Sequence, residues 1–492
     1  FKDGENLDPF TMNFEDDAPR EECGVFGIYT ADPEILPAYA CYNALLALQH
    51  RGQESCGIAV NNDGVISYSK DMGLVTEAFS DAVLSRLEGQ IAVGHVRYST
   101  AGASVRENAQ PLVMRYIKGT LAIAHNGNLT NALEIRRELE CAGSIFQTTI
   151  DSEVIAYLIA RERVGAPSIE EALRRAMRKI HGSYSLLVMS PQKLVAARDP
   201  HGFRPLCIGT IGEGTYVFAS ETCALDACGA EFLRDVEPGE IVVIDKNGLR
   251  SIKPEKKERH SLCIFEYIYF ARTDSVIDGI SVYQARKEAG RILARQSPVE
   301  ADMVIGVPES GIDAAIGYSE ESGIPYQKGI VKNTYIGRTF IKPTQSERER
   351  SVRLKLNPIS SEVKGKRIVM LDDSIVRGTT SARIVSMLKE AGAKEVHLRI
   401  SSPPFLWPCY YGTDIPSKDQ LIACKHTIEE IGQMNFADSI DFLKLENLPH
   451  MLHKDTDEGY CDACFSGDYP AEIPDEEFAR KMNQYCVPIK RY

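Results

Sequence analysis

The sequence predicts an α+β layered domain followed by an α/β domain with a mainly parallel sheet. The chain has 492 residues, and single hydrophobic cores stop growing at roughly 250 to 300 residues, so two or three domains are expected. Between about 23 and 250, strand-like runs are joined by short turns, whereas strand, loop and helix repeat in that order from about 264. The charged stretch DKNGLRSIKPEKKERHS lies between the two patterns and is the expected linker.

Apolar runs mark the strands that we expect in the first domain. Each run is alternately or continuously apolar, as in half-buried or fully buried strands. The runs are 25–29, 56–60, 91–96, 120–125, 184–189, 194–198, 215–220 and 240–245. Helices are expected near 130–142 and 152–180. Strands joined by short turns, with helices segregated between them, are typical of an α+β layered domain.

In the second domain, two segments show the same order of elements. DMVIGV (302–307) runs into PESGIDAAIGYSEESG, and KRIVML (366–371) runs into DDSIVRGTTSARIVSMLKEAG. A strand followed by a loop and a helix is the repeating unit of parallel sheets covered by helices. Such sheets bind ligands at the carboxyl ends of their strands, so we expect the site of this domain in the loops after these runs.

Composition and charge narrow the class of partner. Apolar residues make up 43% and charged residues 25% of the chain, as in ordinary globular proteins, and no run approaches the roughly 20 apolar residues that span a bilayer. The formal charge of -13 argues against nucleic acid, because phosphate backbones are bound by concentrated Lys and Arg. We therefore expect a cytoplasmic protein that binds neither membranes nor nucleic acid.

The two ends of the chain are expected to lie outside the domains. Residues 1–11 precede Met12 and lack the basic start and apolar core of a secretory signal, so we interpret them as a cloning remnant. Residues 471–492 are expected to be a C-terminal tail. Without an export signal, the 13 cysteines are not expected to form a disulfide framework.

Cys23 lies directly before an apolar run and after the mostly polar, acidic stretch 12–22. This pattern suggests a propeptide whose cleavage after Glu22 makes Cys23 the first residue. A terminal amine has a pKa of about 7.7 to 8 and can act as the base for its own thiol, so no catalytic His is required. A buried structural cysteine is the simpler interpretation of Cys23 alone.

The motifs LQHRGQES, GHVRYSTAG, AHNGNL and TTIDSEVIA resemble the N-terminal nucleophile glutamine amidotransferase domain, over nearly all of residues 23–250. The resemblance implies the αββα sandwich of N-terminal nucleophile hydrolases. It also implies that Asn126 and Gly127 form the oxyanion hole and that Arg97 and Asp151 hold glutamine. Fixed donors aimed at a developing oxyanion are worth about 2.7 to 4 kcal/mol each. Taken singly, Arg97 or Asp151 fits a structural ion pair better.

Asp372 and Asp373 follow the apolar run 368–371 and precede SIVRGTTS and an amphipathic helix. The N-terminus of that helix favours a phosphate. Carboxylates beside a phosphate would repel it, so the two acids are expected to face a ribose diol and Mg²⁺ instead. A solvated strand-end turn with a helix cap is the alternative interpretation.

The string VMLDDSIVRGTTS resembles the 5-phosphoribosyl-1-diphosphate (PRPP) motif of type I phosphoribosyltransferases. The PRPP-binding residues expected from it are Asp372, Asp373, Ser374, Arg377, Gly378, Thr379, Thr380 and Ser381.

Two further loops are candidates for the same site. Ser310, in GVPESG, could meet a metal or pyrophosphate from across the crevice, although an ordinary turn is the simpler interpretation of this loop alone. The basic stretch 332–356 shows no clear periodicity. It fits either a solvated loop or a lid, in which Lys332, Arg338 and Lys342 close over a polyphosphate and exclude water.

The motif CDAC places Cys461 and Cys464 close together. A single C-x-x-C fits a redox pair, half a zinc site or half an iron–sulfur site. Cys263 and Cys409, in aromatic and proline-rich surroundings, are plausible donors of two more thiolates. From spacing alone zinc is as good as iron, and a buried pair of cysteines is simpler than either.

From Cys23 to about residue 470 the chain resembles the amidophosphoribosyltransferase family, of the type that carries a propeptide and a [4Fe–4S] cluster. ECGVFGIY, QHRGQES, GRTFI, VMLDDSIVRGTTS and ISSPP match in order. The resemblance implies a type I phosphoribosyltransferase domain over 264–470. The implied cluster ligands are Cys263, Cys409, Cys461 and Cys464, and the implied Mg²⁺ positions are Ser310, Asp372 and Asp373.

The implied activity is conversion of PRPP and glutamine to 5-phosphoribosylamine, glutamate and diphosphate, the first committed step of de novo purine nucleotide synthesis. Ammonia released at Cys23 would pass to the PRPP site. A homotetramer inhibited by AMP and GMP is expected. The alternatives are a PRPP-sensing regulator, which would need no Cys23 constellation, and another glutamine amidotransferase, such as the hexosamine-forming one, which would not need DDSIVRGTTS.

Overall fold

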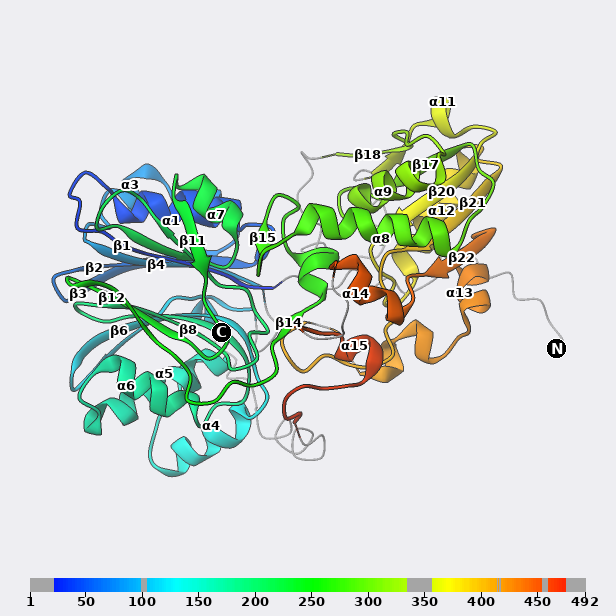
Figure 1. Cartoon of the computed structure of the whole chain (residues 1–492). Coiled ribbons are helices and arrows are strands. Elements are labelled where there is room, and N and C mark those ends of the chain that lie inside the picture. Colours follow the sequence, from blue (N-terminus) through cyan, green and yellow to red (C-terminus); the bar gives the residue numbers. More distant parts are fainter. Residues whose placement is uncertain are drawn as a thin grey trace, which may run out of the picture.

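The computed structural model describes residues 22–98, 104–333, 356–413, 415, 417–453 and 459–474. A sandwich of two sheets and a smaller body built on a parallel sheet lie side by side (Figure 1). The predicted order, an α+β domain followed by an α/β domain with a mainly parallel sheet, is confirmed. None of the described helices is long and apolar enough to cross a membrane.

The first domain contains two sheets in which all neighbouring strands are antiparallel. In spatial order, the larger sheet consists of β11 (Glu231–Asp235), β9 (Cys207–Thr210), β10 (Tyr216–Ala219), β1 (Gly24–Tyr29), β4 (Ile91–Arg97), β2 (Ser55–Asn62) and β3 (Val65–Met72). The other sheet consists of β13 (Gly248–Ile252), β12 (Ile241–Asp245), β8 (Leu194–Arg198), β7 (Gly182–Met189), β6 (Gly119–Leu129) and β5 (Leu112–Tyr116). Side chains from both sheets, including Val25, Val93, Ala124 and Leu187, form the core between them.

Helices cover the outer face of each sheet, which gives four layers (Figure 1). The larger sheet is covered by α1 (Pro37–Ala47), α2 (Val75–Ala78), α3 (Asp81–Leu84) and α7 (Thr222–Ala227), and the other by α4 (Ala132–Cys141), α5 (Asp151–Gly165) and α6 (Ile169–Met177). Alternation along β1 explains the layering: Phe26 and Ile28 face the helices, whereas Val25 faces the other sheet.

Two helical features of this domain differ from the predictions. The single helix expected over 152–180 is two helices, because Pro167 breaks the chain between them and the Ser168 hydroxyl caps α6 by accepting the N–H of Glu171 at 3.3 Å. Helices α1, α2, α3 and α7 were not predicted at all. The buried residues of α1 include Cys41, Ala44 and Leu45, and apolar residues spread around most of its circumference, which hides the helical period.

The second domain is built on a four-stranded parallel sheet with helices on both faces. Its strands, in spatial order, are β17 (Met303–Gly306), β20 (Arg367–Asp372), β21 (Glu395–Ile400) and β22 (Ser439–Phe442). Helices α8 (Val282–Gln296) and α9 (Ile312–Ser322) pack on one face, and α12 (Thr379–Glu390) and α13 (Ile428–Met434) on the other. Gly306 pairs with Leu371, so the loops after β17 and β20 emerge at the same edge.

Short elements join the two domains and complete the second. They are β14 (Ser261–Cys263), which pairs with β23 (Gly459–Cys461), a π-helical turn (Glu266–Phe270), β15 (Val276–Ile277), β16 (Ile280–Ser281), β18 (Ile330–Lys332), β19 (Leu356–Pro358), α11 (Ser360–Val363), α14 (Leu448–Met451) and α15 (Ala463–Ser466). Single 3₁₀ turns lie at Arg106–Asn108, Lys418–Gln420, Ile422–Cys424 and Leu445–Asn447.

Helices α8 and α9 pack with their backbones in contact. A Cβ added to Gly290 of α8 would lie 1.9 Å from the carbonyl oxygen of Ala314. A Cβ added to Gly317 of α9 would lie 1.9 Å from the carbonyl oxygen of Lys287. Only glycine therefore fits at the two crossing points.

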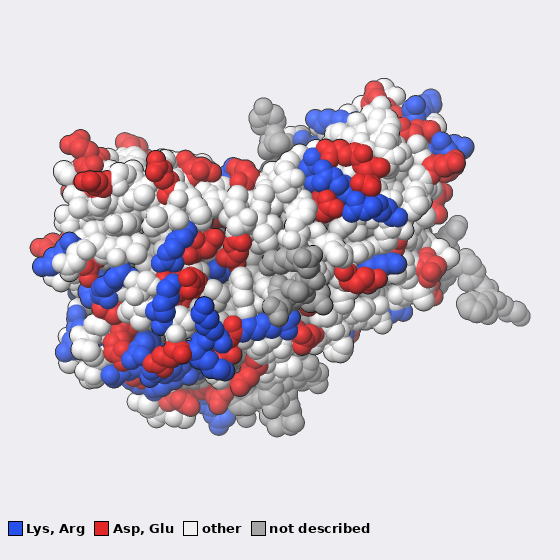
Figure 2. Space-filling view, in the orientation of Figure 1, with Lys and Arg blue, Asp and Glu red and all other residues white. Residues whose placement is uncertain are grey.

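Charges of both signs are mixed on the face shown in Figure 2, and the basic side chains around α6 lie among acidic ones. Arg174 lies 2.8 Å from Glu171, and Arg250 lies 2.6 Å from Glu170. This basic cluster is thus neutralised by its neighbours and does not form the uniform positive surface that a nucleic acid requires.

Candidate active sites

Cys23 lies at the start of β1 and is 7% exposed. Its Sγ donates to the carbonyl oxygen of Tyr98 at 3.5 Å. Burial raises the pKa of the Cys23 thiol to about 11, so the thiol is protonated at neutral pH and needs a base before it can attack. With Glu22 attached, the nitrogen of Cys23 is an amide and cannot serve as that base.

Arg97, the last residue of β4, and Asp151, the first residue of α5, lie close enough for their charges to act on the Cys23 thiol. Asp151 Oδ2 accepts the N–H of Leu129 at 3.0 Å, and Oδ1 lies 3.6 Å from Nδ1 of His125. Burial opposes ionisation of Asp151, but His125 and the Leu129 N–H outweigh it and lower the pKa of Asp151. The structure thus brings an ionised carboxylate and a guanidinium to the predicted nucleophile.

Asn126 lies on β6, where it pairs with Ser185 of β7. It is 1% exposed, and among the described residues its Nδ2 has no hydrogen-bond partner. Burying an unpaired amide costs free energy, which is understandable if the donor is kept for a ligand. The neighbouring Gly127 has φ +146°, and a Cβ there would lie 2.2 Å from the carbonyl oxygen of Ser183, so only glycine fits.

Asp372 ends β20, and both it and Asp373 are 6% exposed. Ser310 Oγ donates to Asp373 Oδ1 at 2.5 Å, and Ser374 Oγ donates to Oδ2 at 2.6 Å. Burial and the charge of Asp373 raise the pKa of Asp372 well above its usual value. Burial also raises the pKa of Asp373, although the hydroxyls of Ser310 and Ser374 partly oppose this. A bound cation would favour the ionised form of both acids.

The loop after β20 leads directly into α12. Gly378 has φ +85°, a left-handed conformation that favours glycine, and α12 begins at Thr379. Ser381 Oγ donates to Asp372 Oδ2 at 3.4 Å, and Arg377 Nη2 donates to Gln420 Oε1 at 3.1 Å. The predicted PRPP-binding residues from Asp372 to Ser381, including Thr380, therefore all lie where β20 ends and α12 begins.

Ser310 reaches the acid pair because its loop packs on the end of β20. A Cβ at Gly311 would lie 2.3 Å from the carbonyl oxygen of Leu371. Of the predicted lid cations, Lys332 is described. Its Nζ lies 4.0 Å from Oε1 of Glu309, the residue directly before Ser310. Arg338 and Lys342 lie outside the described residues.

The four predicted cluster cysteines come from three separate segments of the chain and lie near one another. Cys263 and Cys461 are partners in the parallel pair β14–β23, and Cys409 Sγ accepts the N–H of Tyr411 at 3.4 Å. Burial raises the pKa of the Cys464 thiol well above its usual value, and Cys409, Cys263 and Cys461 raise it further. Four mutually close thiols are the donor set that an iron–sulfur cluster requires.

Neither metal assignment is decided by the geometry. Across the described ranges, no group of three or more His, Cys, Asp or Glu side chains is arranged to hold a metal ion. The ligand sets for Mg²⁺ and for the cluster therefore stay predictions.

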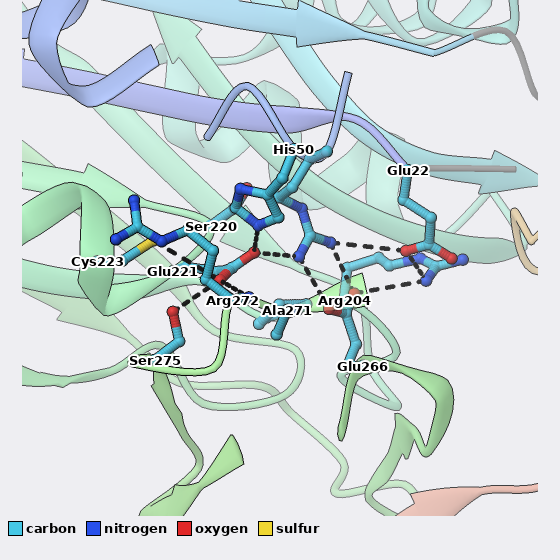
Figure 3. A network of polar contacts seen from close by, with 12 residues as sticks. Glu22, His50, Arg204, Ser220, Glu221, Cys223, Glu266, Ala271, Arg272 and Ser275 are labelled. Atoms are coloured by element: carbon cyan, nitrogen blue, oxygen red, sulfur yellow. Dashed lines mark hydrogen bonds and ion pairs between the residues drawn. The ribbon is translucent and has the colours of Figure 1, made fainter. Parts of the chain in front are cut away.

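A buried network of ion pairs connects the two domains (Figure 3). Arg51 Nε donates to the carbonyl oxygen of Cys23 at 3.0 Å, and its Nη atoms donate to Glu221 and Glu266. Arg204 Nη1 donates to Glu22 Oε2. Glu266 belongs to the second domain, whereas Arg51, Arg204 and Glu221 belong to the first, so an acid of the second domain meets arginines of the first here.

Comparison with known proteins decides the family. A family model described as a glutamine amidotransferase domain matches residues 95–227. An amidophosphoribosyltransferase of Archaeoglobus fulgidus is 53% identical over 456 residues, which cover 92% of this chain and 99% of the relative. One of Bacillus subtilis is 50% identical and covers 92% and 95%. The chain belongs to the amidophosphoribosyltransferase family.

Solved structures of the amidophosphoribosyltransferase family agree with this assignment. Glutamine PRPP amidotransferase of B. subtilis, complexed with ADP and GMP, matches with a TM-score of 0.86 and 49% identity, covering 92% of this chain and 98% of that chain. A structure described as the allosteric regulatory enzyme of purine biosynthesis matches with a TM-score of 0.87 and 49% identity, covering 92% and 97%. These matches confirm the predicted N-terminal nucleophile hydrolase and type I phosphoribosyltransferase folds.

For this member of the amidophosphoribosyltransferase family, sequence reasoning missed the whole interdomain network. Arg51 stands inside the motif QHRGQES, which drew attention to the segment but gave the arginine no role. Arg204, Glu221 and Glu266 lie in segments without a motif of their own. Their only signal was the presence of charged residues beside apolar runs, which is too common to identify partners across a domain boundary.

Proposed function

We propose that this chain converts PRPP, glutamine and water to 5-phosphoribosylamine, glutamate and diphosphate, the first committed step of purine nucleotide synthesis. The observation that carries the proposal is that one chain holds two complementary half-sites. Cys23 lies with Arg97 and Asp151 in the first domain. The acid pair Asp372 and Asp373 precedes a helix N-terminus in the second.

In the first half-reaction, cleavage after Glu22 frees the amine of Cys23. An amine with a pKa of about 7.7 to 8 accepts the thiol proton at neutral pH. The thiolate attacks the side-chain carbonyl carbon of glutamine, and Asn126 Nδ2 with the N–H of Gly127 donates to the oxyanion. Ammonia leaves, a thioester remains on Cys23, and water hydrolyses it to release glutamate.

Substrate binding in that site is assigned to two charged residues. The guanidinium of Arg97 suits the α-carboxylate of glutamine, and the ionised Asp151 suits its α-ammonium. The ammonia product must not meet bulk water, where it would be protonated, so we infer a closed passage to the second domain while both substrates are bound.

In the second half-reaction, ammonia displaces diphosphate from the anomeric carbon of PRPP with inversion. Asp372 and Asp373 accept hydrogen bonds from the ribose hydroxyls, and their charge suits the positive charge that develops on the ribose. The turn from Gly378 to Ser381 donates to the 5′-phosphate. The lid cations Lys332, Arg338 and Lys342 offset the charge of the leaving diphosphate.

Two metal groups belong to the proposal. Ser310, Asp372 and Asp373 would hold Mg²⁺, which supplies positive charge against the diphosphate. Cys263, Cys409, Cys461 and Cys464 would hold a [4Fe–4S] cluster, which would tie β14, the segment before Tyr411 and the C-terminal segment together.

The proposal also covers regulation, oligomeric state and location in the cell. AMP and GMP are the proposed inhibitors, and the B. subtilis relative was solved with ADP and GMP. A nucleotide's 5′-phosphate suits the turn that binds the 5′-phosphate of PRPP. A cytoplasmic homotetramer that binds neither membranes nor nucleic acid is proposed.

Product stoichiometry tests the proposal. The purified chain is mixed with glutamine, PRPP and Mg²⁺, and glutamate and diphosphate are measured together. Equal amounts of the two are expected. The variant Cys23→Ser should lose both products with glutamine but should still release diphosphate when ammonium salts at alkaline pH replace glutamine. Binding of PRPP without turnover in either assay would contradict the proposal and would favour a PRPP sensor.

A further inference from the structure

We propose that Glu266, a residue of the second domain, positions the nucleophile of the first domain by holding Arg51, which in turn holds the backbone of Cys23. The inference rests on the proposed role of Cys23 as the nucleophile. Glu266 would touch no substrate, so it would be a positioning residue.

The first link is the contact of Arg51 with the nucleophile. Arg51 is fully buried, and its Nε donates to the carbonyl oxygen of Cys23 at 3.0 Å. This carbonyl carbon is bonded to the Cα of Cys23, which carries the side chain with the thiol. The hydrogen bond therefore restrains the direction in which the Cys23 side chain points. Misplacement of a reacting group by about 1 Å can cost about 100-fold in rate.

The second link fixes the plane of the Arg51 guanidinium. Nη1 and Nη2 donate to the two carboxylate oxygens of Glu266 at 2.8 Å and 2.7 Å. A bidentate pair of this kind sets orientation as well as charge, and it does so most strongly when both partners are buried, as they are here.

Glu221 also accepts from Arg51, at 2.6 Å, but it has other duties. It accepts from Ser275 Oγ at 2.7 Å and from the backbone N–H of Arg272 at 2.9 Å, and it lies 2.8 Å from His50 Nε2 (Figure 3). Glu266, by contrast, accepts from Arg51 with both carboxylate oxygens and lies 3.6 Å from Arg204.

Glu266 is itself held by the second domain. It starts the π-helical turn, and Arg286 of α8 donates to the carbonyl oxygens of Tyr267, Tyr269 and Ala271 at 2.9, 3.1 and 2.7 Å. The orientation of Cys23 thus depends on a residue whose backbone is fixed by a helix of the other domain.

Removal of the leader changes this network, because it takes Glu22 away. With Glu22 present, the carboxyls of Glu22, Glu221 and Glu266 face the guanidiniums of Arg51 and Arg204. Cleavage after Glu22 leaves two acids for two arginines. Glu266 lies near both arginines, at 2.7 Å from Arg51 and 3.6 Å from Arg204, so it can pair with either once Glu22 is gone.

The substitution Glu266→Gln tests the inference, because it keeps the size of the side chain and removes the charge and one acceptor. Glutamine-dependent kcat should fall about 10- to 100-fold. The KM for glutamine should change less than about twofold, since Arg97 and Asp151 are untouched. Ammonia-dependent release of diphosphate should be unchanged, because it does not use Cys23.

Glu240→Gln is the matched control. Glu240 is equally buried and accepts from Arg234 at 2.8 Å with each oxygen, within the first domain. This variant should keep the glutamine-dependent kcat. Both variants are prepared so that Cys23 is the first residue, verified by intact mass, which removes any effect on leader cleavage. Arg51→Lys, which cannot form the bidentate pair, should reproduce the loss and serves if Glu266→Gln does not fold.

Each result has one meaning. An unchanged glutamine-dependent kcat in Glu266→Gln would overturn the inference, and so would an equal fall in glutamine-dependent and ammonia-dependent rates, which would show a general structural effect. A wild-type chain that begins at Cys23 and releases no glutamate would instead contradict the proposed function itself. The two failures are therefore distinguishable.

Discussion

At the residue scale, Asn126 presents a buried amide donor with no partner among the described residues. We expect Asn126→Ala to lower the glutamine-dependent kcat about 100- to 1,000-fold, since one oxyanion donor is worth about 2.7 to 4 kcal/mol. The KM for glutamine should hardly change, because the donor acts on charge that develops after binding. Steady-state kinetics with glutamine, beside the ammonia-dependent rate, measure both.

Asn61→Ala provides the comparison for this variant. Asn61 is as buried as Asn126, but its Nδ2 donates to the carbonyl oxygens of Ser190 and Pro191 at 3.0 and 2.8 Å. Its loss should lower the melting temperature and leave kcat intact. If Asn126→Ala behaves in the same way as Asn61→Ala, the oxyanion role is wrong.

The acid pair leads to a prediction on stability and pH. The pKa of Asp372 is higher in the folded chain than its unfolded value of about 3.9. The folded state therefore binds the proton more tightly, and this carboxyl's contribution to the free energy of unfolding falls as the pH rises above the unfolded value. Asp372→Asn should raise the melting temperature at pH 8 more than at pH 5, while PRPP turnover falls by about 100-fold or more.

Thermal unfolding with and without Mg²⁺ measures this effect, and added Mg²⁺ should narrow the difference because only the wild-type pair binds it tightly. Asp302→Asn is the control, because folding shifts the pKa of Asp302 in the opposite direction. Hydrogen bonds from Arg367 lower the pKa of Asp302 to about 2, so its ionised form favours folding and its removal should not raise the melting temperature. A lower melting temperature for Asp372→Asn at pH 8 would contradict the argument.

At the element scale, the turn into α12 depends on Gly378. A Cβ there would lie 2.7 Å from Cδ1 of Ile422, and φ is +85°. Gly378→Ala should displace the predicted phosphate loop and raise the KM for PRPP at least about tenfold. Glutaminase activity measured without PRPP should persist.

Gly365→Ala separates displacement of the site from backbone strain. Gly365 has φ +72°, but nothing lies within 4 Å of an added Cβ. The variant Gly365→Ala should lose stability as Gly378→Ala does, but its KM for PRPP should be unchanged. Equal values of KM in the two variants would show that the loop before α12 does not bind PRPP.

Eight strands of the first domain and the two local motifs could be predicted because their signals are short-ranged, whereas β3, β5, β9, β11 and β13 were not predicted. Asp372 directly follows an apolar run, and Cys23 directly precedes one, so each could be placed at a strand end without knowing its distant neighbours. Elements with weak periodicity could not be predicted: α1 is apolar around most of its surface, and the chain breaks at Pro167 inside the single helix expected over 152–180.

Contacts between distant segments could not be predicted. Arg51 and Glu266 are 215 positions apart and meet only after both domains have folded. Likewise, His125 and Asp151 approach each other across β6 and α5, although each sits in a recognisable motif. A local pattern states which residue types are present, whereas pairing of buried charges depends on the packing of whole domains.

At the scale of the whole molecule, the four clustered cysteines connect the domain junction with the C-terminal segment. A [4Fe–4S] cluster would give the wild-type chain a brown colour and about four irons per chain. We expect Cys461→Ser to lose both and to have a lower yield of folded protein. Iron analysis and absorbance near 400 nm measure the first effect. Cys141→Ser, which changes an exposed thiol on α4, should keep both. One zinc per wild-type chain would refute the iron–sulfur assignment.

The glycine contact between α8 and α9 has a consequence for the spacing of the two chemistries. Each helix fills the side-chain position of the other with a carbonyl oxygen, so the pair cannot slide or roll without a backbone collision. Arg286 of α8 holds the turn that carries Glu266, and α9 starts directly after the loop that carries Ser310. The two helices therefore hold the turn with Glu266 at a fixed distance from the loop with Ser310, so helix geometry rather than flexible chain sets the span between these parts of the two proposed sites.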